Sequence, residues 1–174
     1  MQPFIHLHVH SQYSVLDGQA SVKALVDKAI ADGMPGLALT DHGNMFGIKE
    51  FHDYCNKKNG DFNATIKQLK KQLKELDAEN EENRAKIEEL KAEIKSTENK
   101  RFKPIFGCEM YVAEKSLHER TSKHDTGRHL VVLAKNSVGY HNLIKIVSTA
   151  WTEGIENVFN SIKDKVRLEL NTDF

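Results

Sequence analysis

Residues 59–100 constrain the fold of this chain more than any other segment. They contain nine basic and ten acidic side chains among 42 residues, compared with 25 and 25 in the whole chain of 174. A 3-4 spacing runs through them without interruption, at Ile66, Leu69, Leu73, Leu76, Asn80, Asn83, Ile87, Leu90 and Ile94. Such spacing, flanked by Lys and Glu, is typical of coiled-coil helices. The rest of the chain must therefore fold around an inserted helical segment.

Both ends of this insert have to return to one compact domain. A single helix over residues 63–98 would be about 54 Å long at roughly 1.5 Å per residue, and it would hold its ends too far apart. We therefore predict an antiparallel helical hairpin that turns near residues 79–83, where the apolar spacing changes to Asn. The tip has neither Gly nor Pro, so one long helix is the alternative. The insert is either a solvated spacer or a protein-docking arm.

The segments on either side of the insert have the pattern of alternating strands and helices. Residues 4–10 alternate strictly, which predicts a strand with His6, His8 and His10 on one face and apolar side chains on the other. Ser21 is placed to cap a helix that ends near residue 32. Further strands are predicted at residues 36–40, 105–106, 110–112 and 129–134, and further helices at 48–57 and 138–151. This order predicts an α/β fold with a largely parallel sheet or barrel.

Composition argues against several classes of protein. The net charge of zero gives no support for a broad basic surface that holds nucleic acid by electrostatics alone. The longest apolar runs, such as residues 130–134, are far shorter than the roughly 20 residues of a membrane-spanning helix, so we expect no membrane partner. Cys55 and Cys108 are too few for a disulfide framework and favour a reducing, cytoplasmic setting. Cys108 is better interpreted as a buried thiol than as a metal ligand.

Histidines and carboxylates occur where the predicted strands begin or end. His8 and His10 lie two residues apart on one strand face, so their imidazoles can hold one ion or two adjacent ions. The other candidates flank later strands: Asp17, Asp41, His42, Glu109 and His129. Because side chains beyond the carboxyl ends of parallel strands converge in α/β barrels, we expect these residues at one site. Mixed imidazole and carboxylate ligands suit Zn, Mn or Fe.

Three motifs resemble one known family. They are FIHLHVHSQYSVLDG at residues 4–18, MPGLALTDHGNMFG at 34–47 and KPIFGCEMYVA at 103–113, and the similarity continues through HLVVLAKN at 129–136 and GYHNLIKIVS at 139–148. Together they resemble the N-terminal PHP (polymerase and histidinol phosphatase) domain of bacterial DNA polymerase III alpha subunits. The resemblance covers about residues 3–57 and 101–154. The charged insert lies where some members of this family carry an extra coiled-coil segment.

The resemblance implies a distorted, PHP-type β/α barrel with a cluster of up to three divalent metal ions. Residues that match ligand positions of the family are His8, His10, Asp17, His42, Glu109 and His129. His6 and Asp41 are expected to contact these ligands rather than the ions. In relatives with an intact cluster the domain is associated with metal-dependent 3′-to-5′ exonuclease proofreading. The implied partners are DNA and the rest of the polymerase III holoenzyme.

The chain also departs from the family pattern. It is shorter than the family domain, and the later Cys or His ligand and a D-x-H pair have no counterpart. We expect a first part of the PHP domain at residues 1–58, the coiled-coil insert at 59–100, a second part at 101–154, and a helix–strand tail of uncertain origin at 155–174. Such a chain is expected to be a piece of a much larger polymerase and to lack part of the metal-binding shell.

Two other functions stay open at this point. One is a non-catalytic scaffold that docks a proofreading exonuclease or stabilises the polymerase. The other is a free-standing phosphomonoesterase of the histidinol-phosphatase type. The motif HLHVHS at residues 6–11 argues against the second, because that branch of the family usually carries D-x-H-x-H-T.

Overall fold

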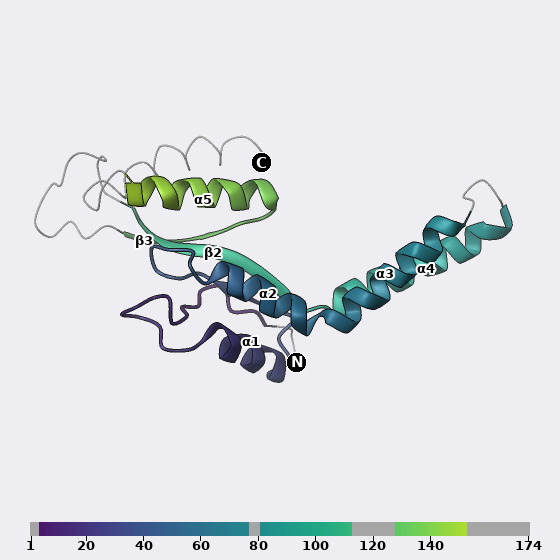
Figure 1. Ribbon diagram of the computed structural model, residues 1–174, viewed down its shortest axis with the longest axis horizontal. Coiled ribbons are helices and arrows are strands. Elements are labelled where there is room, and N and C mark those ends of the chain that lie inside the picture. The colour runs from purple at the N-terminus through teal and green to yellow at the C-terminus, as the bar shows by residue number, and fades with distance from the viewer. Residues whose placement is uncertain (1–3, 77–80, 113–127, 153–174) are drawn as a thin grey trace, which may run out of the picture.

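The computed structural model describes residues 4–76, 81–112 and 128–152. Three strands form one sheet in the order β1 (Gly36–Leu39), β2 (Lys103–Val112) and β3 (Arg128–Leu133). β1 pairs with β2 in parallel, and β2 pairs with β3 in antiparallel orientation. Figure 1 shows α5 (Ser137–Thr152) on one side of this sheet, and α1 (Val22–Ala31) and α2 (Ile48–Lys58) on the other. The described residues therefore form a mixed α/β fold.

The local sequence explains where the first helix begins and ends. The Ser21 hydroxyl accepts a hydrogen bond from the Ala24 N–H over 3.2 Å, and Gly33 follows the helix with a φ of +74°. Val22 and Val26, four residues apart on one face, are fully buried. The predicted helices at α1, α2 and α5 are confirmed. Among the helices of the described ranges, none has both the length and the apolar character to cross a membrane.

Two apolar clusters hold the layers together. The larger combines side chains of α1, β1 and α2, among them Val26, Leu39 and Phe51. The smaller joins β2 to α5 through Cys108, Met110, Leu143 and Ile146. Burial of apolar surface stabilises the folded state by roughly 25 cal/mol per Å². The two clusters therefore hold β1 and β2 between the helices. The packing positions the C-terminal end of β1, which His42 follows, and the part of β2 that carries Glu109.

Residues 4–10 do not form the regular strand predicted for them. They run beside β1, where the Ala38 N–H donates to the His6 carbonyl over 3.0 Å and the Thr40 N–H donates to the Val9 carbonyl over 2.9 Å. The two donors, Ala38 and Thr40, are two residues apart, whereas the two acceptors, His6 and Val9, are three residues apart. The extra residue interrupts the pairing, as in a β-bulge, and breaks the strict alternation of faces.

The sheet also differs from the largely parallel one that was predicted. β2 is one strand of ten residues where two short strands were expected, and β3 is antiparallel to it. Gly107 lies in the middle of β2, and a Cβ at this position would come within 2.7 Å of the Val132 carbonyl oxygen. The absence of a side chain lets β3 approach closely. The three described strands make an open sheet, so a closed barrel remains a prediction.

Residues of the insert form two helices, α3 (Gly60–Glu75) and α4 (Glu81–Lys100), rather than one long helix. Figure 1 shows them side by side and projecting away from the sheet. Lys70 Nζ, in the second half of α3, lies 3.0 Å from Glu98 Oε1 near the end of α4, and Figure 1 shows the two helices running in opposite directions. The apolar contacts between them are made by Ile66, Leu69, Leu90 and Ile94. We call this pair the helical arm; the predicted turn at 79–83 lies partly outside the described residues, and supercoiling of the pair stays a prediction.

Asn59 joins the arm to the sheet. It lies between α2 and α3 and is 2% exposed. Its side-chain Nδ2 donates to the Phe102 carbonyl over 2.9 Å, and its Oδ1 accepts from the Phe102 N–H over 2.9 Å. These two hydrogen bonds connect the residue before the arm to the residue that precedes β2. Both ends of the insert are thereby held next to one another.

Replacing Asn59 with Ala should lower the free energy of unfolding by about 2–4 kcal/mol, because it leaves the buried N–H and carbonyl of Phe102 without partners. Asn99→Ala, at an exposed position of α4, is the matched control and should cost less than about 0.5 kcal/mol. Urea unfolding followed by circular dichroism measures both. Equal losses in the two variants would contradict the role of Asn59.

Candidate metal centre

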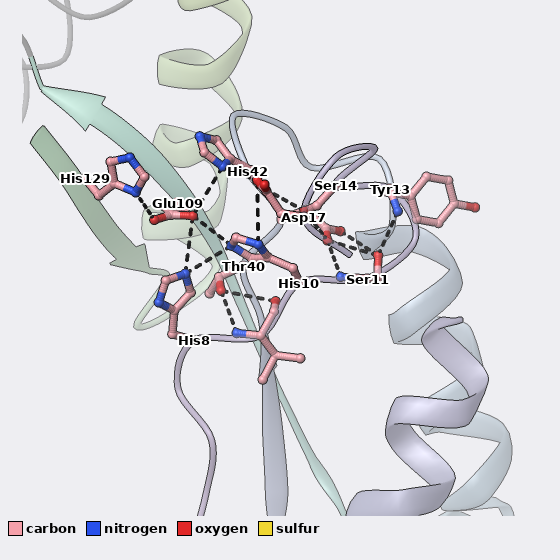
Figure 2. Close-up of polar contacts among 12 residues, drawn as sticks. His8, His10, Ser11, Tyr13, Ser14, Asp17, Thr40, His42, Glu109 and His129 are labelled. Carbon is pink, nitrogen blue, oxygen red and sulfur yellow. Dashed lines mark hydrogen bonds and ion pairs between the residues drawn. The ribbon is translucent and has the colours of Figure 1, made fainter. Parts of the chain in front are cut away.

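The six residues predicted as metal ligands lie in one region of the structure (Figure 2): His8, His10, Asp17, His42, Glu109 and His129. They come from the N-terminal segment, the turn that follows it, the loop after β1, and strands β2 and β3. Residues more than a hundred positions apart in the chain are thus neighbours. The geometry of the group decides what it can bind.

Thr40, at the end of β1, positions the two histidines of the N-terminal segment. Its hydroxyl accepts from the Val9 N–H over 2.9 Å and lies 3.2 Å from the Val9 carbonyl, which also accepts from the Thr40 N–H. The Thr40 side chain is fully buried. Because Val9 lies between His8 and His10, this double contact holds both imidazoles at the end of the sheet.

Glu109 is the point on which the imidazoles converge. His10 Nε2 lies 2.7 Å and His8 Nε2 3.3 Å from Glu109 Oε2. On the other side of the carboxylate, His129 Nδ1 lies 2.5 Å from Oε1. The Glu109 carboxylate therefore contacts the N-terminal segment through Oε2 and β3 through Oε1.

Burial alone would raise the pKa of Glu109, whose side chain is 4% exposed. The hydrogen bond with His129 and the charges of His8 and His42 act in the opposite direction and leave this pKa below its ordinary value. The carboxylate is thus ionised at neutral pH. A buried negative charge needs cationic neighbours, which are either protonated imidazoles or metal ions.

One ion can be held by His8, His10 and Glu109. The two Nε2 atoms lie 3.0 Å apart, and their distances to Glu109 Oε2 are 2.7 and 3.3 Å. Donor atoms around a tetrahedral ion with bonds of about 2.0–2.1 Å lie about 3.3–3.4 Å apart, so small side-chain shifts fit this group to an ion. Two neutral imidazole nitrogens that face each other can share only one proton, whereas both can direct lone pairs at a cation. The donors therefore fit a transition metal that accepts nitrogen and oxygen ligands.

A second group consists of His10, Asp17 and His42. His42 Nδ1 lies 2.6 Å and His10 Nδ1 4.0 Å from Asp17 Oδ2. His10 thus belongs to both groups, with Nε2 toward Glu109 and Nδ1 toward Asp17. A neutral imidazole has one lone pair, so His10 can ligate only one ion at a time. The described residues therefore complete one metal position better than two.

The loop around this centre is organised by Asp41, which is 1% exposed. Its Oδ1 accepts from the Ser11 N–H over 2.6 Å and from the Ser14 hydroxyl over 3.0 Å, and the Ser11 hydroxyl lies 3.0 Å from both carboxylate oxygens. The Ser14 oxygen in turn accepts from the His42 N–H over 2.9 Å. We predicted a contact between Asp41 and an imidazole. Within the described residues its hydrogen bonds go to serines instead, and they hold the backbone that carries the ligands.

His6 and Cys108 lie outside both groups of ligands. His6 is exposed and packs edge-on against Phe4, with ring centroids 4.7 Å apart. The extra residue in the N-terminal segment explains this separation from His8 and His10. Cys108 is fully buried, and burial raises the pKa of its thiol to about 12, so it is a neutral core thiol as predicted.

Two aromatic residues of the centre were missed in the sequence. The ring of Tyr111 lies 4.6 Å from that of His42 and 4.3 Å from that of His129, measured between centroids. Tyr111 is two positions after the central carboxylate on β2, so the period of a strand could have identified it. The Trp151 indole N–H donates to the Gly43 carbonyl over 2.9 Å across 108 positions of sequence. No local pattern signals a contact of that range.

Replacing Asp41 with Asn should lower the free energy of unfolding by about 2–3 kcal/mol, because a buried amide nitrogen would face hydroxyl and N–H donors. Asp53→Asn removes an exposed carboxylate of α2 and should change stability by less than about 0.5 kcal/mol. Urea unfolding at neutral pH compares the two variants. If Asp41→Asn were as mild as Asp53→Asn, the carboxylate would not organise the loop.

Known proteins match this chain over most of its length. The PHP domain family matches residues 6–173. The chain is 39% identical over 155 residues to DNA polymerase III subunit alpha of Treponema pallidum, 36% over 153 residues to that of Chlamydia trachomatis, and 35% over 156 residues to that of Thermus aquaticus. Each similarity covers 87% of this chain and 9–10% of the relative. The chain thus spans about a tenth of the length of these relatives.

These matches confirm the resemblance inferred from the motifs. The family match crosses residues 59–100 and enters residues 155–174, so the four predicted segments stay predictions. The mixed α/β fold agrees with part of a PHP-type domain. From its motifs and from a match to nearly the whole chain, the protein belongs to the PHP domain family.

Proposed function

We propose that this chain is the PHP domain of a DNA polymerase III alpha subunit and that, in the full-length subunit, it is a metal-dependent phosphodiesterase acting at the 3′ end of DNA. The observation that supports this best is the group of His8, His10 and Glu109, whose donor atoms lie 2.7–3.3 Å apart. DNA and the rest of the holoenzyme are the proposed partners of the whole protein. The free thiols of Cys55 and Cys108 support a cytoplasmic setting.

The residues of the chain divide the work of such a site. Divalent ions of Zn, Mn or Fe, up to three in the complete domain, would supply Lewis acidity and lower the pKa of a water molecule beside the scissile phosphate. His129 engages Glu109 Oε1 and so directs Oε2 toward His8 and His10. Outer contacts of this kind orient ligands and tune their basicity. Asp17 and His42 form the adjoining pair that would hold a neighbouring ion.

Replacing His8 and His10 together with Ala should remove bound metal and reduce the 3′ exonuclease rate of the full-length subunit by at least about a hundredfold. Elemental analysis measures the metal, and the rate is measured on DNA with every separate exonuclease removed. His141→Ala, at an exposed position of α5, is the matched histidine control and should retain both.

Unchanged nuclease activity after loss of the metal would overturn the catalytic proposal. Hydrolysis of a small phosphomonoester but not of DNA would favour the histidinol-phosphatase alternative. The similarity to the three relatives above disfavours that alternative, because each of them is a DNA polymerase subunit and none is named as a phosphatase.

A second candidate function is a scaffold that docks another subunit, and the helical arm is the observation that favours it. The arm projects away from the sheet and exposes lysines and glutamates on both helices. Coiled-coil segments with such flanking charges select their partners by charge pairing. We therefore propose the arm as a protein-docking element that acts independently of the metal centre.

Exchanging residues 60–101 for a two-glycine linker tests this second candidate. Because Asn59 and Phe102 are hydrogen-bonded to each other, a short linker can join them without strain. We expect unchanged metal content and at least about tenfold weaker binding to the other holoenzyme subunits, measured by surface plasmon resonance. Equal binding with and without the arm would make it a spacer.

A further inference from the structure

A cleft of about 910 Å³ lies at the base of the helical arm. It is lined by residues of α2, the end of α4, the first half of β2 and the start of α5, and by none of the six candidate metal ligands. Its volume falls within the range of about 300–1,000 Å³ that is typical of small-molecule sites. The cleft is therefore large enough for a ligand and separate from the metal centre.

The charges of this cleft are not balanced. Its two carboxylates, Asp53 and Glu98, are each paired with a lysine. Arg101, Lys103 and Lys135 also line the cleft, and within the described residues none of these three cations has an ion-pair partner. The Nε atom of Arg101 is buried and has no hydrogen-bond partner there. An unsatisfied buried N–H is costly. The three cations without an ion-pair partner among the described residues give the cleft a positive charge that favours an anion.

The first turn of α5 adds a second feature that favours an anion. Asn136 and Ser137 line the cleft, and Asn136 Oδ1 accepts from the Gly139 N–H over 2.9 Å. This cap fixes the start of a helix of 16 residues. The N-terminal end of a helix carries partial positive charge and exposes N–H groups, which suits phosphate.

The cleft also has an aromatic wall. The ring centroids of His52 and Phe106 are 6.1 Å apart, and those of Phe106 and Tyr140 are 5.7 Å apart. All three residues line the cleft. Flat rings of this kind stack against nucleobases whatever the base sequence. A ligand that matches the aromatic wall and the cations of the cleft has a flat ring at one end and several negative charges at the other.

We propose that this cleft binds a nucleoside phosphate, with its base against Phe106 and Tyr140 and its phosphate at Arg101 and the start of α5. Several cations around a helix end suit a doubly charged phosphate better than a single carboxylate, and the guanidinium of arginine can bind phosphate with two parallel hydrogen bonds. The same chemistry is offered by a free nucleotide and by the terminal nucleotide of a DNA strand.

Isothermal titration of the 174-residue chain tests the proposal, with EDTA present so that the metal centre does not contribute. The probes are dADP, deoxyadenosine, inorganic phosphate, a 5′-phosphorylated hexadeoxyadenylate and a hexaglutamate peptide. We expect dADP to bind at least about tenfold more tightly than deoxyadenosine or phosphate alone. If the hexanucleotide binds more tightly than dADP, the ligand of the cleft is the end of a DNA strand. If dADP binds more tightly, the ligand is a free nucleotide.

Variants then locate the binding. Arg101→Gln and, separately, Lys135→Gln should weaken the binding of dADP by about tenfold. Tyr140→Leu should weaken the binding of dADP without affecting the binding of inorganic phosphate. Lys71→Gln, an exposed lysine of the arm, is the control for loss of charge and should change nothing. Circular dichroism verifies that each variant is folded.

The proposal is overturned if the folded wild-type chain does not bind dADP. It is equally overturned if hexaglutamate binds more tightly than dADP. The same holds if Lys71→Gln weakens the binding of dADP as much as Arg101→Gln does and as much as Lys135→Gln does.

Discussion

The buried carboxylate of Glu109 is the interaction on which the candidate centre depends. Its backbone connects β2 to the loop after β1, because its N–H donates to the Asp41 carbonyl and its carbonyl accepts from the Gly43 N–H. Its side chain collects imidazoles from both ends of the described chain. A carboxylate on a side chain that is only 4% exposed stays ionised only among cationic groups, so the surrounding histidines and any bound ion compensate the same charge.

The arrangement of His8 and His10 beside this carboxylate suits a bound cation. His8 and His10 face one another through Nε2 atoms 3.0 Å apart, an arrangement that neutral imidazoles satisfy with one shared proton and a cation satisfies without any. The loop beneath them is held by hydrogen bonds between the Asp41 carboxylate and two serines. Rigid support of this kind keeps ligands close to the geometry an ion requires, at the expense of burying polar groups.

The insert is joined to the sheet at Asn59, whose side chain is hydrogen-bonded to the backbone of Phe102. Asn59 brings the two ends of the arm together, and the cleft lies beside this junction. Three cations of the cleft have no ion-pair partner in the described part of the chain. Lys103 in the cleft and Glu109 in the metal centre are on the same strand, six residues and roughly 20 Å apart at about 3.3 Å per residue. β2 thus connects the cleft at the base of the helical arm with the metal centre. Among the charged side chains that line the cleft, cations outnumber carboxylates, whereas the centre combines imidazoles with carboxylates.

Much of this organisation is present in the sequence, and the physical reason is that local patterns determine local structure. The cap at Ser21, the buried run of β1, the 3-4 spacing of the arm and the types of residue at the metal centre depend on neighbours in the chain. Contacts between distant segments depend on tertiary packing. The extra residue that separates His6 from His8, the antiparallel β3, the serine partners of Asp41 and the indole of Trp151 on Gly43 all pair residues far apart in sequence or depend on such a pairing. The sequence by itself therefore determined which side chains are available for metal binding, whereas only the tertiary structure decided that Glu109 lies at their centre and that cationic side chains and aromatic rings share a cleft.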